Sequence, residues 1–173
     1  MKIIKYLGGP LIVAILACIC QIIDQTIGPM MPIGAGFGWV AFQAWASYFI
    51  CGCNVEGGIK AFFAYIAGIV ASILIMVIGG QFGIMGLGFM AMPIGVLIGV
   101  VPTICTEKVK LLSQTPIIFV AAGAFFGIMS YVPEATFATA AMVEMIYCVL
   151  GLILGYLTIV LRGAYDKKYN SAE

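Results

Sequence analysis

Residues 61–80 read AFFAYIAGIVASILIMVIGG, a run of 20 residues without Asp, Glu, Lys, Arg or His. A helix needs about 20 consecutive apolar residues to cross the hydrocarbon core of a bilayer. Apolar runs of the same kind occupy most of the chain on both sides of this one. The sequence therefore predicts an all-α, polytopic membrane bundle with six transmembrane helices. We expect these spans at about 7–28, 34–52, 58–79, 82–104, 115–132 and 137–161.

The composition excludes a water-soluble domain. The chain has 173 residues, of which 64% are hydrophobic and 9% charged, whereas a soluble domain carries roughly 25% charged residues. The net charge is only +1 and the basic residues form no cluster, so nucleic acid is not an expected partner. The connections are too short for a soluble domain. We expect one integral membrane domain over residues 1–173, ending in a short polar tail at 162–173.

All eight Lys and Arg residues fall on one side of the bilayer in this topology. They precede the first span or follow the second, fourth and sixth spans: Lys2, Lys5, Lys60, Lys108, Lys110, Arg162, Lys167 and Lys168. The other connections carry only Asp24 and Glu134. Cytoplasmic loops are enriched in Lys and Arg, so both termini are expected in the cytoplasm. A signal peptide is the alternative for the first run, but the run continues past Cys18 and is expected to remain a helix.

The spacing of a few residues predicts an inverted repeat of three spans each. A Ser-Tyr pair ends the second span at Tyr48 and the fifth at Tyr131, and each tyrosine is followed 20 residues later by a glycine, Gly68 or Gly151. Inverted repeats place solute sites near the bilayer midplane. The alternative is coincidence in a chain rich in Gly and Ala. Gly151 and Gly155 also form one of several small-residue pairs at spacing four, which favour close helix packing.

Glu144 is the one charged residue well inside a predicted span, since Asp24 and Lys60 lie near the ends of theirs. A carboxyl group within the bilayer is costly, so its side chain is expected to face protein or water rather than lipid. No Lys or Arg lies well inside a span to pair with it. Proton coupling, cation binding or solute recognition is the default interpretation. The alternative is a neutral carboxylic acid that ties two helices together.

Other polar residues could form a site with Glu144. Gln21 and Asp24 share a face of the first span with small residues, and Gln43 lies between two tryptophans in the second. If these faces converge, they form an amide- and carboxyl-lined site that suits a small polar solute. Alternatively, Asp24 ends its helix in water and the tryptophans form an interfacial belt. The candidate solute-binding or gating residues are Glu144, Gln43, Gln21, Asp24, Trp45, Tyr48 and Tyr131.

Catalysis and metal binding are not expected. The absence of histidine removes Ser-His and Cys-His catalysis and the His-containing zinc sites. No nucleophile–base pair and no paired carboxylates share a helix face, so we expect no enzyme. Cys51 and Cys53 supply only half of a metal site, and no cofactor is predicted. Pro93 and Pro102 interrupt the fourth span and predict a kinked helix.

The stretches Trp45–Phe49 and Gly57–Lys60 resemble those of the YcdZ-like family of uncharacterised bacterial inner-membrane proteins. Gly123–Ser130 and Gly151–Tyr156 are also similar to that family, and the resemblance covers most of the chain. The turn over Cys51–Glu56 is longer and richer in cysteine than the usual form of the family. The resemblance implies a multi-pass protein of the bacterial inner membrane and implies no particular activity.

Three functions remain open. We expect a channel or secondary transporter for a small polar solute, assembled as a homo-oligomer because six spans barely enclose a path. The first alternative is a membrane-embedded substrate-binding subunit of a larger transporter. The second is a structural membrane protein whose polar residues only lock helices together.

Overall fold

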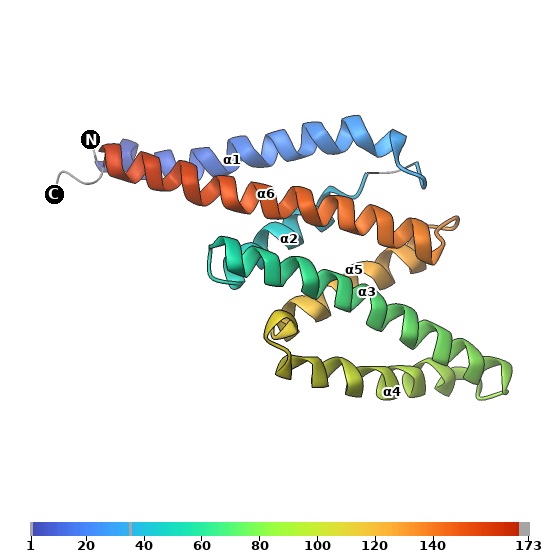
Figure 1. Ribbon diagram of the computed structural model, residues 1–173. Coiled ribbons are helices and arrows are strands. Elements are labelled where there is room, and N and C mark those ends of the chain that lie inside the picture. The colour runs from blue at the N-terminus through green and yellow to red at the C-terminus, as the bar shows by residue number, and fades with distance from the viewer. Residues whose placement is uncertain (1, 35, 170–173) are drawn as a thin grey trace. The chain divides into compact units, whose positions relative to one another are not determined.

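The computed structural model describes residues 2–34 and 36–169 of the chain. This part is all-helical, with 87% helix and no strand. Its α-helices (Figure 1) are α1 (Lys2–Ile27), α2 (Gly38–Ile50), α3 (Val55–Ile84), α4 (Ala91–Cys105), α5 (Thr115–Tyr131) and α6 (Phe137–Tyr169). Short 3₁₀ turns lie at η1 (Gly28–Met30), η2 (Gly88–Met90), η3 (Thr106–Lys108) and η4 (Lys110–Leu112).

Four helical segments are long and apolar enough to cross a membrane. They are Tyr6–Met30, Val55–Ile84, Gly88–Lys108 and Phe137–Tyr169. The chain is therefore compatible with a multi-pass membrane protein. The predicted second and fifth spans are shorter: α2 has 13 residues and α5 has 17, which at 1.5 Å per residue is about 20 Å and 25 Å against a core of about 30 Å. The six-span count stays a prediction.

The predicted third span ends at residue 79, whereas α3 continues through the glycine pair at 79–80 to Ile84. A glycine costs a helix only about 1 kcal/mol, and here the missing side chain allows another helix to approach. A Cβ atom on Gly79 would collide with the sulfur of Met92. The chain turns instead at Gly86 and Gly88, whose φ angles of 86° and 54° are left-handed.

The second helix begins later than the sequence predicted. We expected it from residue 34, but α2 starts at Gly38. Residues 31–34, 36 and 37 before it are not helical, although Phe37 is only 4% exposed. Of the described residues in this non-helical segment only Phe37 is buried, and α2 is shorter at its start than the predicted second span.

Pro93 does not interrupt the fourth helix. It lies in the first turn of α4, where its missing N–H has no helical acceptor to lose. Pro102 lies inside α4, and it remains the residue at which a kink is expected.

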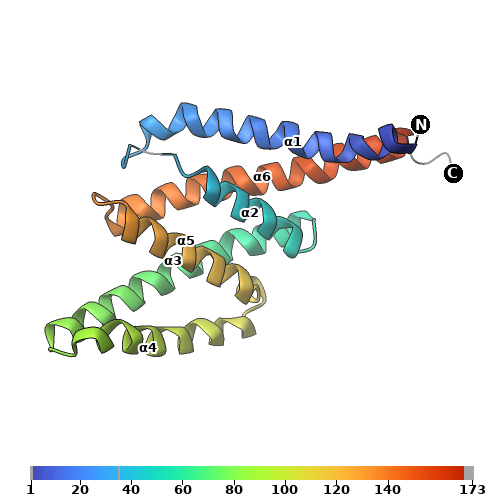
Figure 2. The same ribbon diagram turned by 180° about the vertical axis from the view of Figure 1, so that it is seen from behind.

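The chain forms two compact units, and each has its own packing. Unit 1 combines the residues up to Gly58 with those from Ile146 onward. In this unit α6 approaches α2 through glycines: a Cβ atom on Gly151 would overlap the Ala41 carbonyl oxygen. The first turns of α1 lie along the end of α6 (Figures 1 and 2), where the Tyr165 ring covers Gly8.

Unit 2 covers Ile59–Met145 and packs α3 against both α4 and α5. The Ser72 hydroxyl donates a hydrogen bond of 2.9 Å to the Gly68 carbonyl oxygen of its own helix. It also lies 3.3 Å from the Ala122 carbonyl oxygen of α5. A Cβ atom on Gly95 of α4 would come within 2.9 Å of the Ile75 carbonyl oxygen. Small residues thus bring the helices together, as their spacing predicted.

Candidate functional site

One buried edge of α1 places an aspartate inside unit 1. Leu16 and Cys20 are 5% and 0% exposed, and Asp24 follows at the same spacing of four and is half-buried. Residues four apart share a helix face, so the three side chains point to the same side of α1. This edge differs from the predicted polar face, because Gln21, the other polar residue of that face, is exposed. Because Leu16 and Cys20 are buried, this edge of α1 faces the rest of unit 1, and Asp24 lies on the same edge.

The Asp24 carboxyl group lies against the backbone that leads into α2. A Cβ atom on Gly36 would sit 2.5 Å from Asp24 Oδ1, and one on Gly38 would sit 3.1 Å from its Cγ. Only glycine permits so close an approach at these positions. The first turn of α2 has no side-chain cap from Phe37, and a helix N-terminus carries a partial positive charge. The Asp24 carboxylate therefore lies beside the N-terminus of α2, whose partial positive charge attracts it.

Two further side chains complete this group. Gln21 Nε2 donates a hydrogen bond of 3.2 Å to Asp24 Oδ2. The Tyr147 hydroxyl of α6 interacts with the Asp24 carboxyl group and the Phe37 backbone, although neither contact has the distance and angle of a full hydrogen bond. The rings of Phe37 and Tyr147 meet edge to face, with centroids 6.3 Å apart. We call Gln21, Asp24, Phe37 and Tyr147 the Asp24 cluster.

The Asp24 cluster can accept hydrogen bonds from a ligand. Asp24 Oδ1 is buried and has no hydrogen-bond partner among the described residues, and the same holds for the Tyr147 hydroxyl. Buried polar groups in native proteins nearly always have partners. A carboxylate oxygen accepts only, whereas a phenol hydroxyl both donates and accepts. The cluster thus fits a small molecule that donates hydrogen bonds or carries positive charge.

Glu144 lies in unit 2, which contains the first residues of α6 up to Met145. Its side chain is 0% exposed, and in the described part of the chain neither carboxyl oxygen has a hydrogen-bond partner. The predicted packing face is buried: Ala140 and Cys148, one turn away on either side, are also 0% exposed. An unpaired buried carboxyl group is costly. Glu144 therefore stays a functional candidate by the same argument that singled it out in the sequence.

The other predicted residues lie outside the Asp24 cluster. Trp45 is 4% exposed and stacks on Phe42 with centroids 6.0 Å apart. Gln43 is half-buried, and its side-chain oxygen has no partner in the described chain. Tyr48 packs against α6, because a Cβ atom built on Gly155 of α6 would lie 2.7 Å from the Cβ atom of Tyr48. Within the described residues, no hydrogen bond or ring contact joins these side chains to Asp24.

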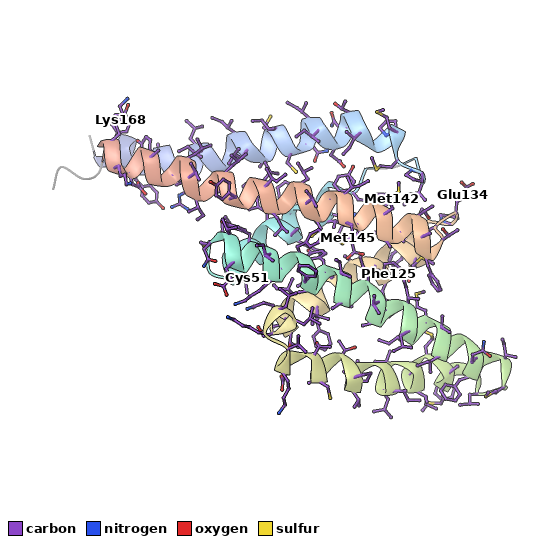
Figure 3. All side chains as sticks on the ribbon, viewed as in Figure 1. Cys51, Phe125, Glu134, Met142, Met145 and Lys168 are labelled. Carbon is purple, nitrogen blue, oxygen red and sulfur yellow. The ribbon has the colours of Figure 1, made fainter. Side chains whose placement is uncertain are left out.

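Tyr131 does not belong to a buried site. It is the last residue of α5 and is 87% exposed. The loop that follows carries Glu134, which is also exposed (Figure 3).

Sequence reasoning missed Tyr147 and Phe37. Tyr147 follows Glu144 by three residues, so it lies on the same helix face, and this spacing was the available signal. Phe37 stands between Gly36 and Gly38. Paired glycines around an aromatic residue indicate close approach of backbone to another group, but they do not name that group.

No group of three or more His, Cys, Asp or Glu residues in the described chain lies close enough to hold a metal ion.

A family model matches residues 10–162, and its description is "Protein of unknown function (DUF1097)". A search of curated proteins and a search of solved structures found no match. The finer grouping with YcdZ-like proteins stays a prediction.

Proposed function

The chain belongs to the DUF1097 family of proteins of unknown function, and we propose that it is a channel or secondary transporter for a small polar solute. It works in the bacterial inner membrane as a homo-oligomer, with both termini in the cytoplasm. Its own side chains bind the solute without a cofactor, and no catalytic step is part of the proposal.

The observation that carries this proposal is the buried, unpaired Oδ1 of Asp24 beside the start of α2. Transporters build solute sites where a helix is interrupted, because the freed backbone and the helix terminus supply polar groups within the bilayer. Here α2 has only 13 residues, and non-helical residues precede it. An acidic side chain at such an interruption is a solute or ion ligand by default.

Glu144 supports the same function from unit 2. A structural carboxylic acid would be expected to hydrogen-bond to a neighbouring helix, yet its two oxygens have no partner among the described residues. A carboxyl group in this condition can take up a proton, a cation or a hydrogen-bond donor. The two acidic side chains together favour a solute that is neutral and rich in donors, or cationic, over an anion.

Oligomer formation is supported by the surfaces of the long helices. Along α1, residues Leu7, Leu11 and Ile15 are 52%, 60% and 52% exposed, and they recur every four residues on one face. Lipid or a second copy of the chain covers such a face in a membrane. A path formed by one copy has few helices to enclose it, so several copies are proposed.

A flux assay tests the proposal. The full chain is purified, placed in sealed vesicles and offered a panel of small neutral, cationic and anionic solutes, with protein-free vesicles as the reference. We expect faster entry of at least one neutral or cationic polar solute. High-affinity binding without flux would instead support a substrate-binding subunit. If no solute of the panel were bound or transported, both the transporter and the binding-subunit hypotheses would be contradicted. A structural protein would then be the remaining interpretation.

A further inference from the structure

Unit 2 contains an apolar groove of about 480 Å³ between α3, α4 and the turns that follow α4. We call it the α3–α4 groove. It is partly open, and it is lined by Phe63, Ile66, Ala67, Val70, Ala71, Leu74, Pro102, Thr103, Thr106, Val109, Leu111 and Leu112. Its volume lies in the range of sites that hold whole ligands, roughly 300–1,000 Å³.

The groove exists because α3 and α4 touch at one end and separate toward the other. The two helices run antiparallel: Gly79 contacts Met92, and Gly99 contacts Ile75. Glycines keep the backbones close at that end of the pair. Beyond it, toward the start of α3, the bulky Phe63 and Pro102 line the opening.

The lining offers nothing to a polar solute. Its only hydroxyl groups belong to Thr103 and Thr106. Thr103 donates a hydrogen bond of 2.7 Å to the Gly99 carbonyl oxygen, and Thr106 donates one of 2.6 Å to the Thr103 carbonyl oxygen. Both donors are therefore used by backbone carbonyl oxygens of α4, and the remaining lining is hydrocarbon. On α3 the lining residues extend over 63–74, which at 1.5 Å per residue is about 16 Å of helix. This length and chemistry fit an acyl chain.

Positive charges stand at one end of the groove. Lys108 and Lys110 are exposed, and they alternate along the chain with the lining residues Val109 and Leu111. Lys60 precedes the lining residue Phe63 by one helical turn. Glu107 is the one acidic residue in the turn, so the end of the groove has a net positive charge.

We propose that the α3–α4 groove binds an anionic phospholipid of the membrane leaflet on the Lys-rich side. One acyl chain lies along the apolar lining, and the phosphate of the headgroup meets the ammonium groups of Lys108 and Lys110. Basic side chains beside an apolar gap between membrane helices supply both parts of such a ligand. The positive-inside rule predicts that this leaflet is cytoplasmic, where anionic lipids are available.

Native mass spectrometry of the full chain in a neutral detergent tests the lipid site. The probes are phosphatidylglycerol and phosphatidylcholine with identical acyl chains. Each lysine near an anionic surface contributes about 1 kcal/mol, which is about fivefold in affinity. We expect phosphatidylglycerol to bind at least fivefold more tightly than phosphatidylcholine, and we expect Lys108→Gln with Lys110→Gln to remove this preference.

A matched pair of lysines controls for total charge. Lys167 and Lys168 are exposed at the end of α6 and lie outside the groove; Figure 3 labels Lys168. The double variant Lys167→Gln with Lys168→Gln should keep the preference for phosphatidylglycerol. Equal binding of the two lipids to the unmodified chain, or the same loss in both double variants, would overturn the proposal.

A second variant tests the apolar part independently. Ala67→Trp fills the groove and should weaken both lipids, whereas Val77→Trp on the exposed side of α3 should leave them unchanged. If Ala67→Trp kept lipid binding and converted an oligomer into a monomer, a second copy of the chain would be the occupant and the lipid proposal would be wrong. Should Ala67→Trp fail to fold, the two lysine variants still decide the outcome.

Discussion

The Asp24 cluster and the α3–α4 groove lie beside helices of similar apolar character, yet they have opposite chemistry. The segments Tyr6–Met30 and Val55–Ile84 have mean hydropathies of 2.2 and 2.6. In the cluster a buried carboxylate oxygen is left unpaired. In the groove both threonine hydroxyls donate to backbone carbonyl oxygens of α4. In a membrane bundle, average hydropathy therefore says less about a site than whether each polar group is already satisfied locally.

The largest expected effect comes from breaking the packing that holds unit 1 together. Gly151→Leu places a side chain where the Ala41 carbonyl oxygen lies. Overpacking of a close contact costs typically 1–3 kcal/mol, and more where backbone blocks the side chain. We expect a loss of about 3 kcal/mol in the free energy of unfolding, measured by denaturation in detergent. Gly163→Leu is the control, because no atom lies within 4 Å of that Cβ position, and an equally large loss there would contradict the account.

The next effect separates function from packing at Glu144. Glu144→Gln keeps the volume of the side chain but replaces the ionisable carboxyl group with a neutral amide. Folding should therefore persist while solute flux falls. Hydrogen bonds to charged groups contribute about 1.5–3 kcal/mol, so the expected fall is about tenfold or more. Glu107→Gln in the exposed turn after α4 is the matched control. Wild-type flux in Glu144→Gln would make this residue a structural acid.

A smaller effect should follow from removing one hydroxyl of the Asp24 cluster. Tyr147→Phe keeps the ring contact with Phe37 and removes the group that faces Asp24. One neutral hydrogen bond contributes about 1 kcal/mol, so flux should fall about fivefold. Tyr131→Phe, at the exposed end of α5, should leave flux unchanged. If both variants behaved alike, the cluster would not contribute to solute binding.

The smallest effect concerns the glycine pair inside α3. No atom lies within 4 Å of a Cβ atom on Gly80, whereas Gly79 faces Met92. Alanine is favoured over glycine in a helix by about 1 kcal/mol. Gly80→Ala should therefore raise the free energy of unfolding by about that amount, and Gly79→Ala should lower it. Thermal unfolding of the two variants side by side checks the difference in sign.

Much of the helical architecture could be predicted from hydropathy. The membrane class and the presence of the first and sixth helices follow from runs of apolar residues, because a helix in lipid must satisfy its own backbone. Their extents were predicted less well: α1 begins at Lys2 rather than at residue 7, and α6 continues past residue 161 to Tyr169. Burial of Glu144 followed from the cost of a carboxyl group in lipid. These predictions depend on local composition alone. They needed no knowledge of which helix neighbours which.

The rest depends on contacts between segments far apart in the chain. The third span was predicted to end at residue 79, and the contact of Gly79 with Met92 within the longer α3 is visible only in the fold. The late start of α2 and the approach of Tyr147 to Asp24 likewise arise between separate segments. Hydropathy does not encode such pairings. The inverted repeat remains a prediction for the same reason.

The most direct measurement compares two variants that each remove one carboxylate. Initial flux rates of the transported solute are recorded in the same vesicle preparation for Asp24→Asn, in the cluster, and for Glu134→Gln, in the exposed loop before α6. If the Asp24 cluster is the solute site, Glu134→Gln keeps the wild-type rate. Asp24→Asn is then slower by about tenfold or more, since a charged hydrogen-bond acceptor is lost. Equal rates in two folded variants would contradict the assignment of the Asp24 cluster as the solute site.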